Sequence, residues 1–172
     1  TKNSLISIDL DILTDLAKNN LVHVMFSVTG TDEKIRQLLE PRTATYKTRL
    51  NTLALLAKNN VPCGVMVAPI IPGINNHEIP EVLKQAGNAG ASNAGITIVR
   101  LNGAIEHIFK DWLIKNFPDR ADKVWNQICD CHGGKVSDSR KGVRMRGEGK
   151  IAESIMQLFK LSKERFITSS KK

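Results

Sequence analysis

Polar and basic side chains stand at the ends of apolar segments, where they could bind a ligand. Ser27 and Thr29 close the first segment, and their hydroxyls could hydrogen-bond a polar group. Arg100 closes the last segment, where its guanidinium could pair with a carboxylate or phosphate; a structural salt bridge explains it almost as well. Just after the first segment, Thr31 or Asp32 could serve simply as the cap of the next helix.

The middle segment leads into a proline-rich exit, residues 68–76 (APIIPGINN). Pro69 and Pro72 stiffen the backbone and could present carbonyl oxygens as a wall against a flat ligand. A rigid turn with no ligand is the alternative explanation. Arg42 lies in a loop before a later helix, from which it could reach this region or form a surface ion pair.

The three cysteines do not indicate a metal site or a disulfide framework. Cys129, Cys131 and His132 are close in sequence, but no second pair of Cys or His lies at a zinc spacing. An odd, sparse cysteine count predicts reduced thiols. Residues 147–150 (GEGK) lack the spacing and the preceding strand of a phosphate-binding loop.

Regular elements must bring these segment ends together. Three apolar runs rich in Val and Ile predict strands covered on both faces, at residues 21–29, 61–71 and 95–101. Helical periodicity precedes and separates them, at residues 9–19, 43–60 and 77–89. This alternation predicts an α/β fold with parallel strands, as an open sheet or as part of a barrel. In such folds the loops at the carboxyl ends of the strands converge.

The helix ends carry their own signals. The pairs Asn19–Asn20 and Asn59–Asn60 can end a helix through a left-handed residue. Thr43 and Asn76 could cap the helices at 43–60 and 77–89 by accepting backbone N–H bonds.

The pattern changes after residue 101. Residues 104–116 and 119–131 predict two helices, residues 133–149 a glycine-rich basic loop, and residues 150–166 a final helix. We therefore divide the chain into an α/β part, residues 1–102, and a helical, basic C-terminal extension, residues 103–172.

Positive charge is concentrated in that extension. The net charge is +8, and residues 133–172 carry 11 Lys and Arg against 4 Asp and Glu. Such a concentration is typical of surfaces that bind phosphate or nucleic acid, although a solvated tail at residues 169–172 explains part of it. A non-catalytic nucleic-acid-binding module is therefore the alternative to an enzyme.

The composition, 41% apolar and 24% charged, fits one globular core. No run of 18 apolar residues and no signal-peptide pattern occurs, so we expect a soluble, cytoplasmic protein. The sequence opens at Thr1 within an already patterned segment, and we expect a fragment of a longer chain.

Several motifs in this order resemble the radical S-adenosylmethionine (SAM) proteins known as DNA repair photolyases, relatives of spore photoproduct lyase. The motifs are SVTGTD at 27–32, LEPR at 39–42, VAPIIPG at 67–73 and RMRGEG at 144–149. With shorter pieces between them, the resemblance covers nearly the whole chain.

The resemblance implies a partial parallel (β/α) barrel whose fourth strand would end at residues 1–2. It also implies a 4Fe–4S cluster held by a CxxxCxxC loop, which this sequence lacks, and its three cysteines have the wrong spacing. In such enzymes the reduced cluster cleaves SAM to a 5′-deoxyadenosyl radical, which abstracts hydrogen from the substrate. We therefore expect a lyase-like parent enzyme, and a fragment that alone binds no cluster and is inactive.

The resemblance also implies roles for individual residues. Residues that would contact the methionyl carboxylate or the ribose of SAM are Lys2 and Ser27, and residues that would lie along its adenine are Ala68, Pro69 and Ile70. Looser candidates for the substrate side are Thr29, Arg42 and Arg100. DNA or another nucleic acid is the candidate partner. We also expect an exposed edge at the strand of residues 21–29, through which two copies could pair.

Overall fold

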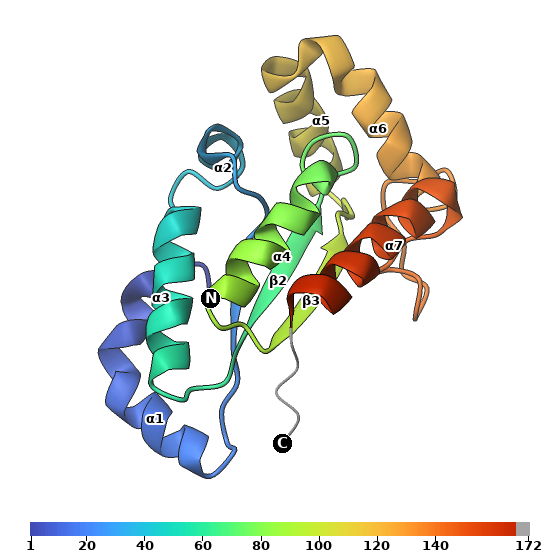
Figure 1. The fold of residues 1–172 in the computed structure, drawn as a ribbon. Helices are drawn as coiled ribbons and strands as arrows, with labels where there is room; N and C mark the ends of the chain where they lie inside the picture. The colour runs from blue at the N-terminus through green and yellow to red at the C-terminus, as the bar shows by residue number, and fades with distance from the viewer. Residues whose placement is uncertain (168–172) are drawn as a thin grey trace.

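Three parallel strands form the centre of the molecule, whose computed structural model describes residues 1–167. The strands are β1 (Val24–Ser27), β2 (Cys63–Ile70) and β3 (Asn93–Ile98), in the spatial order β1-β2-β3 (Figure 1). Ser27 lies beside Met66 in the register, and Met66 lies beside Gly95. The predicted α/β class is therefore confirmed, and the sheet with its flanking helices is consistent with part of a (β/α) barrel.

Thr1 continues the sheet beyond β1. The Thr1 nitrogen donates to the Met25 carbonyl at 2.7 Å, and the Ser27 N–H donates to the Thr1 carbonyl at 2.9 Å. This alternation of bonds is that of a parallel pair of strands. Lys2 is thereby fixed next to the carboxyl end of β1.

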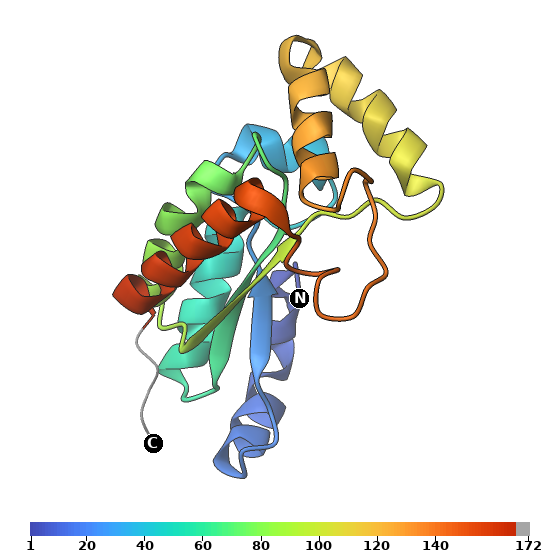
Figure 2. The ribbon, with the colours of Figure 1, turned by 90° about the vertical axis from the view of Figure 1, so that its right-hand side faces the viewer.

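Helices cover one face of the sheet. The helices of this part are α1 (Leu10–Lys18), α2 (Glu33–Leu39), α3 (Tyr46–Lys58) and α4 (Ile79–Asn88), with 3₁₀ turns at Ser4–Asp9 and Asn76–Glu78. In Figures 1 and 2, α3 and α4 lie side by side over the sheet. The strand residues that face them, such as Phe26 and Val65, are fully buried. Ser27 and Met66, on the opposite face, are only half-buried.

The C-terminal region adds a second core and then returns to the first. Its elements are α5 (Ile105–Asn116), a 3₁₀ turn at Pro118–Arg120, α6 (Ala121–Asp130) and α7 (Gly149–Phe166). Apolar side chains of α5 and α6 pack on Ile71, Ile74 and Leu101, just beyond the strands. Helix α7 instead packs against α4, so that α3, α4 and α7 form one layer (Figure 2).

The first two strands begin later than predicted, β1 at Val24 and β2 at Cys63, whereas β3 begins two residues earlier than predicted, at Asn93. Leu21, placed in the first strand, is 70% exposed, because pairing begins only where Val24 meets the Pro62 carbonyl. Asn20 and Asn60 do adopt positive φ angles, 56° and 60°, as predicted for the helix ends. Both predicted caps were wrong. Thr45, not Thr43, accepts a hydrogen bond from the first turn of α3. Glu78 is the N-cap residue of α4, and Asn76 accepts from the Gly73 N–H instead.

No helix within residues 1–167 is both long enough and apolar enough to cross a bilayer.

Candidate ligand-binding site

The open face of the sheet carries a polar group at the carboxyl end of β1. Ser27 lies on this face, and its hydroxyl forms no hydrogen bond within the described residues. Its backbone is fixed on both sides: the N–H donates to the Thr1 carbonyl, and the carbonyl accepts from Arg49 Nη1 at 2.7 Å. A hydroxyl on so rigid a backbone is available to a ligand at low entropic cost.

Arg49 holds this corner together from inside. Its side chain is 0% exposed, and besides Ser27 it donates to the Ala44 carbonyl at 2.9 Å, to Glu40 Oε2 at 2.8 Å and to Thr43 Oγ1 at 2.5 Å. Every named bond goes to a different residue. Four of its five N–H groups are thus bonded, and a buried guanidinium needs such partners to offset the cost of its desolvation.

Glu40 is shared between two cations. Its carboxylate accepts from Lys2 Nζ through Oε1 and from Arg49 through Oε2. Burial raises the pKa of Glu40, but the hydrogen bonds and charges of Lys2 and Arg49 outweigh it and hold the pKa below its ordinary value. One carboxylate facing two cations leaves a net positive charge beside Ser27, and Lys2, whose side chain is 41% exposed, presents it to solvent.

Asn75 and Glu78 bind the exits of β1 and β2 to each other. The Asn75 amide donates to the carbonyls of Thr29 at 2.8 Å and Pro69 at 3.1 Å, and its Oδ1 accepts from the Ile71 N–H at 2.7 Å. Glu78 Oε2 accepts from the Thr31 hydroxyl at 2.7 Å. The Ala68–Pro69 peptide bond is cis. The bonds of Asn75 and Glu78 hold the exit of β2 in one position relative to the exit of β1.

The predicted cofactor-side residues do not all share one environment. Lys2 and Ser27 belong to one network, because Glu40 binds both Lys2 and Arg49, and Arg49 binds the Ser27 carbonyl. Ala68 and Pro69 are half-buried at the end of β2, whereas Ile70 is fully buried in the core beneath the helices. Any contact between Ile70 and a ligand would thus involve its backbone.

The predicted substrate-side residues lie apart. Thr29 is buried, and its hydroxyl shares a 2.5 Å hydrogen bond with Tyr46, whose pKa burial raises to about 12. Arg42 is exposed in the turn between α2 and α3. Arg100 follows β3, and its Nη1 donates to the Asp138 carbonyl at 3.5 Å. Their roles toward a substrate remain predictions.

Asp32 caps a helix, which is the alternative predicted for it from the sequence. Its side chain accepts from the Lys34 N–H at 2.8 Å and caps α2. Thr31 is held by Glu78 instead.

The thiols are not arranged as metal ligands. Cys63 and Cys131 are buried, and burial raises the pKa of each to about 11, with Asp130 adding to the effect at Cys131. Across residues 1–167, no group of three or more His, Cys, Asp or Glu side chains could hold a metal ion.

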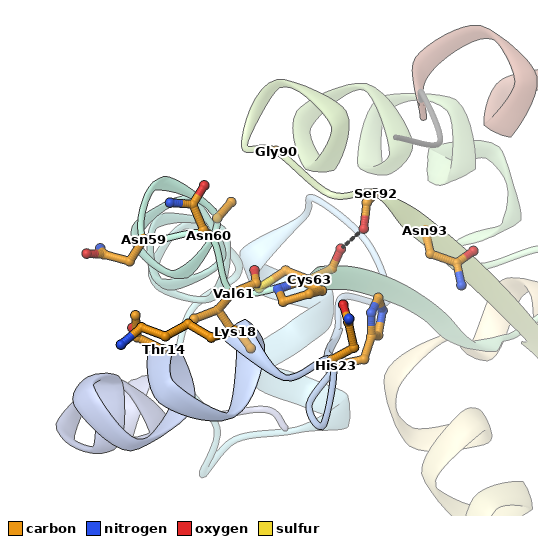
Figure 3. Close-up of a pocket in the computed structure, with 14 residues that line it drawn as sticks. Thr14, Lys18, His23, Asn59, Asn60, Val61, Cys63, Gly90, Ser92 and Asn93 are labelled. Atoms are coloured by element: carbon orange, nitrogen blue, oxygen red, sulfur yellow. Dashed lines mark hydrogen bonds between the residues drawn. The ribbon is translucent and has the colours of Figure 1, made fainter. Parts of the chain in front are cut away.

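The other end of the sheet holds a cavity of about 880 Å³ (Figure 3). Residues that precede or begin the strands line it, among them His23, Cys63 and Asn93. The Ser92 hydroxyl donates to the Cys63 carbonyl at 3.0 Å within it. This cavity is on the side of the sheet away from the strand exits, so it does not belong to the Ser27 site.

Comparison with protein families gives a match over the N-terminal half of the chain. Residues 2–86 match the Radical SAM superfamily. The match includes Lys2, Ser27, Glu40, Arg49 and Asn75, so the side chains described around the Ser27 site lie within the matched segment.

Individual relatives are uncharacterized. Proteins of Mycobacterium bovis and Mycobacterium tuberculosis are each 27% identical to the chain over 121 residues, which are 69% of this chain and 36% of the relative. A protein of Acidianus two-tailed virus is 33% identical over 72 residues, 42% of this chain and 23% of the relative. The chain thus spans about a third of the mycobacterial relatives that it matches. No solved structure matches the chain significantly.

The radical SAM superfamily uses SAM and a 4Fe–4S cluster, and the two fit this chain differently. The Ser27 site fits SAM in kind, since a free hydroxyl and an exposed ammonium beside it suit a carboxylate or a sugar hydroxyl. The cluster requires thiolates gathered in one loop. Cys63 and Cys131 instead lie in the core with raised pKa values, so the described residues do not fit it.

Glu40, Arg49, Asn75 and Glu78 were not predicted as site residues. Glu40 carried a signal in the sequence only as part of the LEPR motif at residues 39–42. Asn75 and Glu78 gave no comparable signal, because their partners lie 46 and 47 residues away in sequence.

Proposed function

We propose that the chain is part of a radical SAM enzyme of the DNA repair photolyase type, related to spore photoproduct lyase. The observation that carries the proposal is the Lys2–Glu40–Arg49–Ser27 network at the carboxyl end of β1, inside the matched residues 2–86. The motifs quoted above support the subtype. The longer relatives support a parent protein that extends beyond these 172 residues.

In this proposal the open face of the sheet binds SAM. Lys2 and Ser27 bind the methionyl carboxylate or the ribose. Lys2 carries the uncompensated positive charge, and the Ser27 hydroxyl is free within the described residues. Residues 68–70 lie along the adenine, with Asn75 fixing their backbone. The residues on the substrate side are Thr29, Arg42 and Arg100. The two arginines supply positive charge, and Thr29 contributes through its backbone, because its side chain is buried.

The cluster belongs to a different part of the parent protein. A CxxxCxxC loop outside this chain supplies its thiolates, because the three cysteines here are not arranged for it. When bound, the cluster and SAM together supply the hydrogen-abstracting chemistry. This chain binds and orients the cofactor and is inactive alone.

The test is the full-length parent protein, reconstituted anaerobically with iron and sulfide. We expect a 4Fe–4S absorption spectrum and reductant-dependent formation of 5′-deoxyadenosine. The 172-residue chain treated in the same way serves as the control and should form none above blank. Absence of both signals in the parent would overturn the proposal, and product from the chain alone would overturn the assignment of the cluster to another part.

A second candidate, nucleic-acid binding through the basic loop, has one observation in its favour. Residues 133–148 return to the strand exits, where the Leu101 N–H donates to the Val136 carbonyl at 2.7 Å. Lys135 and Arg144 of this loop are exposed. Arg140 is already neutralised by Asp138 and Glu148. Binding of a DNA duplex should weaken steeply as salt rises if these cations contact phosphates, and salt-independent binding would reject this candidate.

A further inference from the structure

Glu40 binds two cations, Lys2 and Arg49, and only one of them can also bind a ligand. Arg49 is completely buried, and four of its five N–H groups donate to Ser27, Ala44, Glu40 and Thr43. It cannot meet a ligand. Lys2 donates to Glu40 alone within residues 1–167, and an ammonium has three N–H groups. Lys2 is therefore the cation of the pair that can bind a second anion.

Glu40 fixes the position of the Lys2 ammonium. A lysine side chain has four rotatable carbon bonds and loses much entropy when fixed. The Glu40 carboxylate is 9% exposed and is itself held by Arg49, so it offers Lys2 a rigid anchor. Thr1, the residue before Lys2, is paired with β1 on either side of Phe26. The backbone of Lys2 is thus fixed next to β1, and its ammonium is fixed on Glu40, which also binds the Arg49 side chain that holds the Ser27 carbonyl.

We propose that Glu40 is the positioning residue of a carboxylate-binding site, which holds the Lys2 ammonium beside the Ser27 hydroxyl so that together they bind the methionyl carboxylate of SAM. This inference rests on the proposed function and names the part of SAM that Glu40 serves. Arg49 keeps Glu40 ionised and in place. The nucleoside part of SAM does not depend on Glu40.

The experiment compares two ligands on the full-length parent protein. SAM carries the methionyl carboxylate, and 5′-methylthioadenosine has the same nucleoside without it. Glu40→Gln keeps the shape but removes the charge that anchors Lys2. We expect its dissociation constant for SAM to rise about tenfold or more, since a charge-assisted hydrogen bond is at stake, with no more than about a twofold change for 5′-methylthioadenosine.

Two further variants separate positioning from general stability. Glu33→Gln is the matched control, since Glu33 also forms an ion pair, with Arg36, and accepts from the Tyr46 N–H at 2.6 Å, but does not contact Lys2. It should leave the ratio of the two affinities unchanged. Lys2→Gln should lower the SAM affinity as Glu40→Gln does, and the double variant should be no worse than Lys2→Gln alone.

Each outcome has a separate meaning. Equal weakening of both ligands by Glu40→Gln would overturn the positioning role and leave the proposed function standing. Binding of neither ligand to the unmodified parent would overturn the proposed function and this inference together. If Glu40→Gln fails to fold, Lys2→Gln decides: an unchanged ratio of affinities would overturn the proposal.

Discussion

The side-chain amide of Asn75 donates a 2.8 Å hydrogen bond to the carbonyl of Thr29, across 46 residues of sequence. The same amide bonds Pro69, and its oxygen accepts from the Ile71 N–H. One buried side chain thus satisfies three backbone groups at the exits of β1 and β2. It also couples the two strand exits that frame the Ser27 site.

Removal of this side chain should destabilise the protein strongly. Asn75→Ala leaves three buried backbone groups without partners, and each costs about 1–3 kcal/mol when orphaned; partial relaxation should bring the total loss to about 3 kcal/mol. Urea unfolding followed by circular dichroism measures it. Asn76→Ala is the control, because Asn76 accepts a single bond, from the Gly73 N–H, at an exposed position. Equal losses for the two variants would contradict the role given to Asn75.

Arg49 should be irreplaceable by an apolar side chain of similar length. Arg49→Met leaves the Ser27 and Ala44 carbonyls without the hydrogen bonds of Arg49 and removes one of the two cations that bind the Glu40 carboxylate. Breaking a buried pair from one side typically costs about 3–5 kcal/mol. Arg42→Met, at an exposed arginine seven positions away, should change the unfolding free energy by less than about 0.5 kcal/mol. A tolerated Arg49→Met would show that the network contributes little to stability.

Acid should weaken the network from the carboxylate side. The pKa of Glu40 is lowered in the folded state, so its contribution is complete above the pKa of an unfolded glutamate, about 4.3, and is lost as the pH falls below that value. The unfolding free energy should therefore fall less steeply with decreasing pH in Glu40→Gln than in the unmodified protein. Parallel curves for the two proteins between about pH 5 and pH 3 would contradict this assignment.

The cysteines should differ in reactivity. Burial raises the pKa of Cys63 and Cys131 to about 11, so at neutral pH they are thiols shielded from reagent. Cys129 is only half-buried. Iodoacetamide should label Cys129 first, and the other two at a comparable rate only in urea, as mass spectrometry of the peptides would report. Fast labelling of Cys63 in the folded protein would be incompatible with the core described here.

Gly87 should resist replacement even though it lies inside a helix. A Cβ atom at this position would overlap the Phe166 carbonyl oxygen at the end of α7. Gly87→Ala gains about 1 kcal/mol of helix propensity, but overpacking costs about 1–3 kcal/mol, so the net change should be destabilising. Asn88→Ala, one residue on and exposed, has no such clash and should be neutral or stabilising in the same thermal melt. A more stable Gly87→Ala would mean that α7 is not seated on α4.

Sequence reasoning succeeded where the cause is local. The Val- and Ile-rich runs became strands, Asn20 and Asn60 took positive φ angles, and Asp32 capped α2, because neighbours in the chain decide these outcomes. The cap of α3 failed for a non-local reason. Thr43, the predicted cap, donates to the Glu40 carbonyl and accepts from Arg49, so its hydroxyl was not available.

The candidate site could be predicted only in part for the same reason. Lys2 and Ser27 carried a signal through their resemblance to a family, whereas Glu40 and Arg49 gain meaning only when the loop after α2 meets the end of β1. Ile70 was predicted as a ligand-side residue, but its side chain is buried in the core.

The seating of α7 on α4 bears on the order in which the protein can fold during synthesis. The ribosome delivers α4 with the radical SAM segment, and domains generally fold as the N-terminal part emerges. The flank of α4 that meets α7 must then stay uncovered while α5, α6 and the basic loop are still being made. A nascent chain halted before α7 would therefore display an apolar surface suited to a chaperone.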